Sequence, residues 1–292
     1  MSIFRLKRHA MACEFAITIE GEGGQALADI ANFALDEVEQ LDETLSCFRA
    51  TSEVSFVNEE AARRPVIVGP DLFEILSTAK DVWRDTGGAF DVTSGPLVGL
   101  WRTAERTGIA PERQAIDAAL EKVGMTHVLL DEATHAVRFA IEGIRVNLGA
   151  IGKGYAVRKA ASILREYGVE SALVSAGGST VQAIGAGWKV GIRHPSKLDE
   201  RVAEIQLNDQ AMSTSGGPAQ RDEHVGERFE HIVDPVTGSA AESVAASVSV
   251  ITDDAMLSDA LATAFYLRGP ELARRFAGVR AVFVDPEGRT FE

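Results

Sequence analysis

Cysteine is scarce in this sequence, with Cys13 and Cys47 the only two among 292 residues. Two cysteines are too few for a disulfide framework, and they are too isolated to supply the ligands of a zinc site. We therefore expect both to be small, buried, apolar side chains.

Long apolar runs and an excess of positive charge are also missing. No stretch approaches the about 18 apolar residues of a transmembrane helix, and charges interrupt the segment before Cys13, which rules out a signal-peptide core. With 29 basic and 43 acidic residues the net charge is −14, which disfavours nucleic-acid binding because phosphate contacts need clustered Lys and Arg. We predict a soluble, cytoplasmic protein with no membrane span and no nucleic-acid partner.

The hydrophobic pattern predicts an α+β fold. Apolar positions recur every three or four residues over 25–45, which is typical of a helix, while 12–20 alternates like a strand. The segment 84–101 is rich in glycine and is predicted to be mostly loop. No linker is visible, so we expect one domain over 1–292, made of two intimately packed halves. Further helices are predicted at 70–84, 113–123 and 254–267, strands at 127–130, 136–139 and within 170–195, and a strand, a turn and a helix over 144–168.

The stretch "NLGAIGKGYA" (147–156) is a glycine-rich turn that opens a helix. Free backbone N–H groups and the positive end of the helix dipole can hold a phosphate there, and Lys153 adds a positive charge. It is not a P-loop, because no Ser or Thr follows Lys153. The alternative is tight packing of strand and helix beside a solvated lysine.

The stretch "SDALATAF" (258–265) places Asp259 and Thr263 one helical turn apart, on one face. Two oxygen ligands on one face suit a hard cation such as Mg²⁺. The alternative is a solvated Asp beside a Thr that bonds the carbonyl four residues before it.

Two further segments combine turn residues with reactive side chains. In "HIVDPVTG" (231–238), His231 can act as a general base, since the side chain of histidine ordinarily titrates near operating pH, or it is a structural turn residue. In "GGAFDVTSGPLVGLW" (87–101), Phe90 can stack on a flat ligand, or the loop only packs on the core.

Read together, these motifs resemble the FAD:protein FMN transferases, the ApbE family. The stretches "AGGSTVQAIG", "WKVGIRHP" and "STSGG" extend the resemblance, and the ordered set spans about residues 10–268. The resemblance implies a T-fold-like α+β fold of antiparallel sheets and packed helices, with FAD in a cleft between two halves. It also implies Mg²⁺-dependent cleavage of the FAD pyrophosphate, transfer of FMN to a Thr or Ser of a target flavoprotein, and release of AMP.

The resemblance also implies roles for individual residues. The Mg²⁺ site falls on the carbonyl near Ala150 and on Asp259 and Thr263. The phosphate cradle falls on Gly149, Lys153 and Gly154. Catalysis falls on His231 as base, with Asp234 orienting the loop or the imidazole and Lys153 clamping the phosphates. Further contacts to FAD are expected from Met11, Phe90, Asp91, Gly177, Gly178, Ser215, Gly216 and Thr237.

The sequence departs from the family pattern at several positions. Ser179 follows the double glycine where the family has Asp, and Asn147 and Arg158 also replace Asp. Two alternatives therefore stay open: a Mg²⁺-dependent FAD pyrophosphatase that uses water as acceptor, and a non-catalytic flavin-binding protein. The sequence names neither the target flavoprotein nor the oligomeric state.

Overall fold

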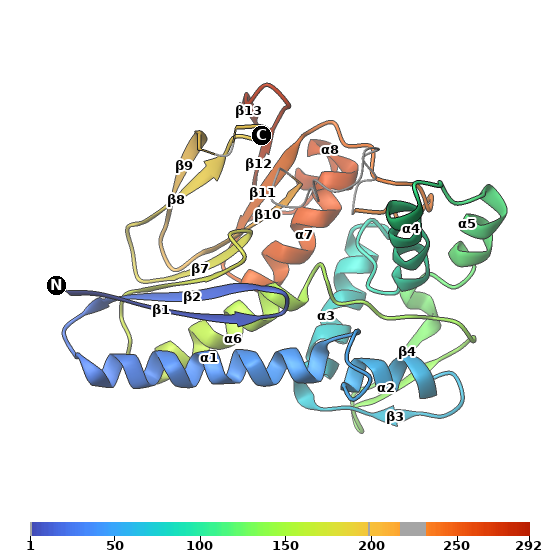
Figure 1. The fold of residues 1–292 in the computed structure, drawn as a ribbon, viewed down its shortest axis with the longest axis horizontal. Coiled ribbons are helices and arrows are strands. Elements are labelled where there is room, and N and C mark those ends of the chain that lie inside the picture. The colour runs from blue at the N-terminus through green and yellow to red at the C-terminus, as the bar shows by residue number, and fades with distance from the viewer. Residues whose placement is uncertain (1, 198, 217–231) are drawn as a thin grey trace.

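The computed structural model describes residues 2–197, 199–216 and 232–292, and an eight-stranded antiparallel sheet runs through it (Figure 1). The sheet takes strands from both ends of the chain. Its order is β1 (Ser2–Ala10), β2 (Cys13–Gly21), β6 (Ala172–Ala176), β7 (Thr180–Ile184), β10 (Ala211–Gly216), β11 (Ser247–Thr252), β12 (Arg280–Val284) and β13 (Thr290–Phe291).

Three helices pack on one face of this sheet: α1 (Gln25–Leu45), α6 (Gly152–Glu166) and α7 (Ala255–Arg268). In α1 the buried side chains, from Ala31 to Leu45, follow the three- and four-residue spacing of one helix face. Helix α7 lies between α6 and strands β10 and β11, and ten of its fourteen residues are buried. Any polar group on α7 therefore needs a partner inside the protein.

A two-stranded ribbon contributes the second core. Strands β8 (Trp188–Arg193) and β9 (Arg201–Leu207) pair antiparallel and bury Ile192, Ile205 and Leu207 against the sheet residues Val181 and Met212. This cluster is distinct from the main one under α1, α6 and α7. Both faces of the large sheet are thus covered by apolar side chains.

The remaining elements gather beside the ends of α1 and α7 (Figure 1). They comprise α2 (Glu53–Glu60), α3 (Pro70–Asp85), α4 (Gly95–Thr107), α5 (Arg113–Leu120), the 3₁₀ turn Met125–His127, the small sheet β3 (Val66–Ile67), β5 (Ala136–Phe139) and β4 (Val128–Asp131), and α8 (Pro270–Ala273). Most helices and strands expected from the sequence are present, and the α+β class is confirmed.

The prediction that 84–101 is mostly loop was wrong for its second half, because α4 begins at Gly95. Pro96 stands at the start of the helix, where its missing N–H costs nothing. A side chain at Gly95 would collide with the backbone carbonyl of Arg145, so this glycine permits close packing and does not mark a loop.

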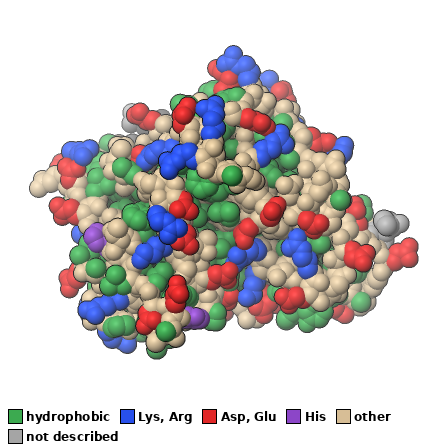
Figure 2. Space-filling view, turned by 180° about the vertical axis from the view of Figure 1, so that it is seen from behind, with side chains coloured by type: hydrophobic (Ala, Val, Ile, Leu, Met, Phe, Trp, Pro, Cys, Tyr) green, Lys and Arg blue, Asp and Glu red, His purple; other side chains and the backbone are tan. Residues whose placement is uncertain are grey.

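Both cysteines are free and partly buried. Figure 2 shows acidic and basic side chains interspersed on one face of the molecule, so on this face the acidic excess is not gathered into one patch. None of the helices in the described ranges has both the length and the apolar composition that crossing a bilayer requires.

Candidate active site

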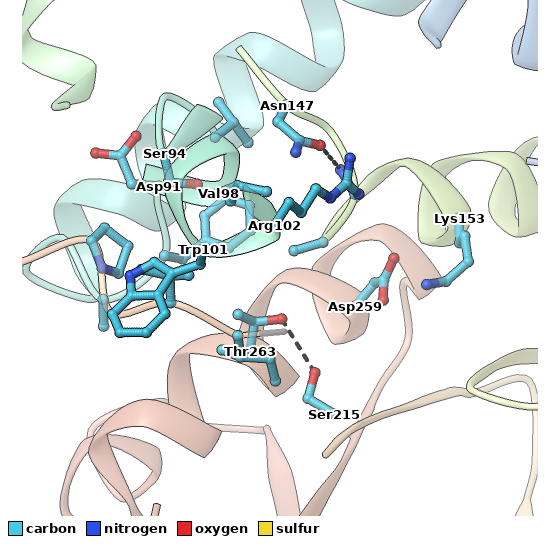
Figure 3. Close-up of a pocket in the computed structure, with 18 of the residues that line it drawn as sticks. Asp91, Ser94, Val98, Trp101, Arg102, Asn147, Lys153, Ser215, Asp259 and Thr263 are labelled. Atoms are coloured by element: carbon cyan, nitrogen blue, oxygen red, sulfur yellow. Dashed lines mark hydrogen bonds between the residues drawn. The ribbon is translucent and has the colours of Figure 1, made fainter. Parts of the chain in front are cut away.

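A cavity of about 470 Å³ opens between α4, the turn before α6, and α7 (Figure 3). Its walls come from segments that are far apart in the sequence. The polar and charged side chains around it are Asp91, Ser94, Arg102, Glu105, Asn147, Lys153, Ser215, Asp259 and Thr263. The motifs read as phosphate cradle and cation pair therefore face one space.

The turn that opens α6 is held by its own side chain and by the neighbouring loop. Asn147 accepts a hydrogen bond from the N–H of Gly149 at 2.9 Å, and its own N–H donates to the carbonyl of Val92 at 2.7 Å. Among the residues that the structure describes, the N–H groups of Ala150 and Lys153 have no acceptor. Gly149, Ala150 and Lys153 all line the cavity, so unused donors and a positive charge face the same space.

Asp259 is a buried carboxyl group in the wall of this cavity, with only 6% of its surface exposed. It accepts hydrogen bonds from the N–H of Gly154 at 2.9 Å and from the hydroxyl of Thr180 at 3.4 Å. Burial raises the pKa of Asp259 above its ordinary value, while the nearby charge of Lys153 and the Gly154 N–H oppose this rise. Within the described part of the chain no basic group lies within 4 Å of the carboxylate, so it has no direct ion pair.

Thr263 stands one turn further along α7, on the same cavity wall. Its hydroxyl lies 3.2 Å from the hydroxyl of Ser215 on β10, and the two are joined by a dashed line in Figure 3. The alternative of a solvated Asp259 beside a Thr263 bonded to its own helix is therefore wrong, because the Asp is buried and the Thr contacts a different element.

The donors on this wall fit a hard divalent cation. Mg²⁺ prefers oxygen ligands. This wall offers three: the buried carboxylate of Asp259, the hydroxyl of Thr263 one turn away, and the backbone carbonyl of Ala150. No group of three His, Cys, Asp or Glu side chains suited to a metal occurs among the described residues. A cation bound here would rely on one carboxylate, leaving other positions for water or phosphate oxygens.

Phe90 and Asp91 line the cavity but lie within its wall. Phe90 is 1% exposed and packs in the main core, so it presents almost no ring surface for a ligand to stack on. Asp91 accepts hydrogen bonds from the N–H and hydroxyl of Thr93 at 2.7 and 2.6 Å. Burial raises the pKa of Asp91, although the bonds from Thr93 oppose the rise.

The loop after residue 231 closes another side of the cavity through Ile232, Val233 and Pro235. His231 itself lies outside the described residues, so its assignment as base stays a prediction. Asp234 forms a two-bond ion pair with Arg268 of α7, at 2.8 and 2.9 Å. This ion pair ties the loop to α7, and a role of Asp234 in orienting the loop or the imidazole stays a prediction.

The loop that contains Asp234 is also anchored to helix α4. The indole N–H of Trp101 on α4 donates to the carbonyl of Gly238 at 2.9 Å. Thr237 lies outside the cavity lining, and its hydroxyl accepts from the N–H of Ser239 at 3.3 Å. A contact between Thr237 and FAD stays a prediction.

Met11 lies at the tip of the β1–β2 hairpin, with a positive φ of 49°. It lines a second cavity of about 190 Å³, which shares Phe48, Asn147, Gly149 and Lys153 with the first. The sequence analysis missed Phe48, a ring that is 72% exposed and borders both cavities. Nothing in its local sequence distinguishes it from an ordinary surface residue.

Four of the predicted ligand-binding glycines have structural roles. Gly154 lets α6 approach α7 closely, because a Cβ there would lie 2.7 Å from the Asp259 Cβ. Gly216 has a φ of 80°, and a Cβ there would meet the Tyr266 ring at 2.5 Å. Gly177 and Gly178 form the β6–β7 turn at φ of 56° and 69°. None of the four lines either cavity, so their contacts with FAD stay predictions.

Comparison with known proteins gives one consistent result. Residues 11–283 match the model of the ApbE family. A FAD:protein FMN transferase of Treponema pallidum is 33% identical over 283 residues, covering 88% of this chain and 78% of that protein, and one of Escherichia coli K12 is 28% identical, covering 98% and 85%. Among solved structures, the ApbE protein of Thermotoga maritima matches with a TM-score of 0.89 at 28% identity, covering 100% of this chain and 97% of that one. The apo flavinyl transferase ApbE of Pseudomonas stutzeri matches with a TM-score of 0.84 at 28% identity, covering 99% and 93%.

Proposed function

The chain belongs to the ApbE family, and on that premise we propose that it is a Mg²⁺-dependent FAD:protein FMN transferase. The proposed substrates are FAD and a target flavoprotein with an acceptor Thr or Ser. The proposed products are a flavoprotein carrying FMN through a phosphoester, and AMP.

The observation that carries this proposal is the buried carboxylate of Asp259 beside a cavity that also holds Lys153. Placing a carboxylate out of water without a direct ion pair is costly, and such a cost is typical of a site that binds a positive ligand. The free N–H groups at the start of α6 then supply donors for an anion beside that ligand.

We assign the cation to Asp259, Thr263 and the carbonyl of Ala150. When bound, Mg²⁺ would neutralise charge on the phosphate oxygens of FAD. Lys153 and the N-terminus of α6 would hold the same pyrophosphate by charge and by hydrogen bonds.

The transfer itself requires one proton acceptor. The oxygen of the acceptor hydroxyl bonds to the phosphorus of the FMN half, and the bond from that phosphorus to the AMP oxygen breaks. We assign the hydroxyl proton to the imidazole of His231, since a hydroxyl with a pKa far above 7 needs a base at hydrogen-bond distance. The ion pair of Asp234 with Arg268 and the bond from Trp101 to Gly238 would hold the following loop in place.

The experiment is co-expression of the chain with candidate flavoproteins from the same genome, followed by intact mass measurement of each candidate. We expect one candidate to gain the mass of covalent FMN, and the gain to disappear when its acceptor Thr is replaced by Val. The purified reaction should require both FAD and Mg²⁺, and it should stop in excess EDTA.

The matched controls are the chain with Asp259→Asn and the chain without any acceptor. Asp259→Asn should abolish the mass gain while leaving the protein folded, because only one carboxylate lies on the proposed cation site. Release of free FMN in the absence of acceptor, with no mass gain on any candidate, would instead identify the protein as a FAD pyrophosphatase.

A further inference from the structure

Arg102 is a basic side chain of the cavity that the resemblance to known transferases does not assign. It projects from α4, and Figure 3 shows it extending toward Asn147 in the turn before α6. Within the described ranges of the chain no carboxylate lies within ion-pair distance of its guanidinium. Its charge is therefore available to a ligand in the cavity.

The guanidinium of Arg102 is held by an aromatic ring. Its central carbon lies 4.7 Å from the centroid of Phe48, which borders the same cavity. Stacking on a ring face orients the planar group and leaves the N–H donors at its edge free. A planar fork of donors that is already oriented matches the paired oxygens of a phosphate group.

The charges of the cavity lining favour a role for the guanidinium of Arg102 in binding an anion. The basic side chains of its described lining are Arg102 and Lys153, and the acidic ones are Asp91, Glu105 and Asp259. Lys153 lies near the Asp259 carboxylate and partly offsets its charge. Without a bound cation, the lysine alone therefore leaves little positive charge for the two negative charges of a pyrophosphate.

We propose that Arg102 binds a phosphate group of FAD, donating from its guanidinium edge to non-bridging oxygens while its face stays stacked on Phe48. This inference rests on the proposed function, because it takes FAD as the ligand of the cavity. It makes Arg102 a second cationic contact, supplied by α4, in addition to Lys153 on α6.

The test is the dissociation constant of FAD for four variants, measured by calorimetry in EDTA so that no transfer occurs. Arg102→Ala should weaken FAD binding by about 5- to 50-fold, the range of a charge-assisted hydrogen bond at a partly exposed site. Arg102→Lys should be intermediate, because it keeps the charge and loses the fork. Arg102→Met keeps an apolar stem against Phe48 without charge, and should bind as weakly as Arg102→Ala.

Arg106→Ala is the matched control, since Arg106 is an exposed basic residue one turn further along α4 that does not line the cavity. It should bind FAD as the wild type does. Wild-type affinity in Arg102→Ala, or its restoration in Arg102→Met, would overturn the phosphate contact and leave only a packing role. A wild-type protein that binds no FAD either in EDTA or with Mg²⁺ would overturn the proposed function itself, which separates the two failures.

Discussion

The contact between α6 and α7 passes through Gly154, and Gly154→Ala tests whether this contact builds the site. A Cβ at this position would collide with the carbonyl oxygen of Ala255 and lie 2.8 Å from the Cα of Met256. Both neighbours are backbone atoms inside a buried helix, so no side chain can rotate away to make room.

The expected cost follows from two opposing effects. Forcing an extra methyl group into a packed interior costs about 1–3 kcal/mol, and rigid backbone neighbours place this case near the upper end. Alanine recovers up to about 1 kcal/mol of helix propensity relative to glycine. We expect a net loss of about 2 kcal/mol in the free energy of unfolding. The Tm should then fall by about 3 °C, because a chain of 292 residues has an entropy of unfolding of about 0.6 kcal/mol/K.

The assay is thermal unfolding of the purified protein, with and without Mg²⁺. Separation of the helices also weakens the 2.9 Å bond from the Gly154 N–H to Asp259, so any Mg²⁺-dependent rise in Tm should shrink in Gly154→Ala. Gly152→Ala is the matched control in the same helix turn, since its Cβ would meet only the Leu148 Cβ at an ordinary 3.6 Å. A Gly154→Ala protein as stable as Gly152→Ala would refute the packing argument.

Three further substitutions test other parts of the structure. Asp259→Asn should leave the Tm in EDTA unchanged or higher, because it removes a buried charge. It should also abolish the rise in Tm that Mg²⁺ gives the wild type. A large loss of stability in EDTA would contradict a cation site. Asp234→Asn should cost about 1–2 kcal/mol at pH 7 by breaking the pair with Arg268, which lowers the pKa of Asp234 even though burial opposes it. That cost should be full above about pH 4 and fade at lower pH as the wild-type carboxylate is protonated, and denaturant unfolding against pH shows whether it does. Arg158→Asp should lower stability by about 1 kcal/mol in the same assay, since the partly buried Arg158 pairs with carboxylates of α3 and of the residue before α7. An unchanged stability would show that these two ion pairs contribute nothing.

The sequence predicted the elements whose pattern is local. Helix α1 has a continuous apolar face, and its predicted bounds, 25–45, agree with the structure. Strand β1 was not predicted. It is an edge strand in which three Lys or Arg residues and one His interrupt the apolar residues. Helix α4 was obscured by its glycine and proline residues. Of these, Gly95 is required because the backbone of Arg145 approaches it closely.

The residues of the candidate site also differ in how far a local sequence pattern could predict them. Local spacing predicted that Asp259 and Thr263 share a helix face and that Lys153 stands at a turn, and all three line the cavity. Their proposed roles came from the family resemblance. The place of Phe48 and Arg102 in the site could not be predicted from the sequence. Each is an exposed side chain, and the two come together only because the loop after α1 packs beside α4 in the folded protein. A sequence also cannot distinguish a glycine that admits a ligand from one that admits a neighbouring backbone.

Gly154 shows why that distinction matters for this protein. The same residue removes the Cβ that would separate α6 from α7 and donates its N–H to the carboxylate of Asp259. Lys153, the residue before it, carries the positive charge that partly offsets that carboxylate. The proposed phosphate and cation contacts are therefore two sides of one helix–helix contact. Changes in the packing of α6 against α7 should consequently alter affinity for FAD and for Mg²⁺ together, whereas changes at Arg102 on α4 should alter affinity for FAD alone.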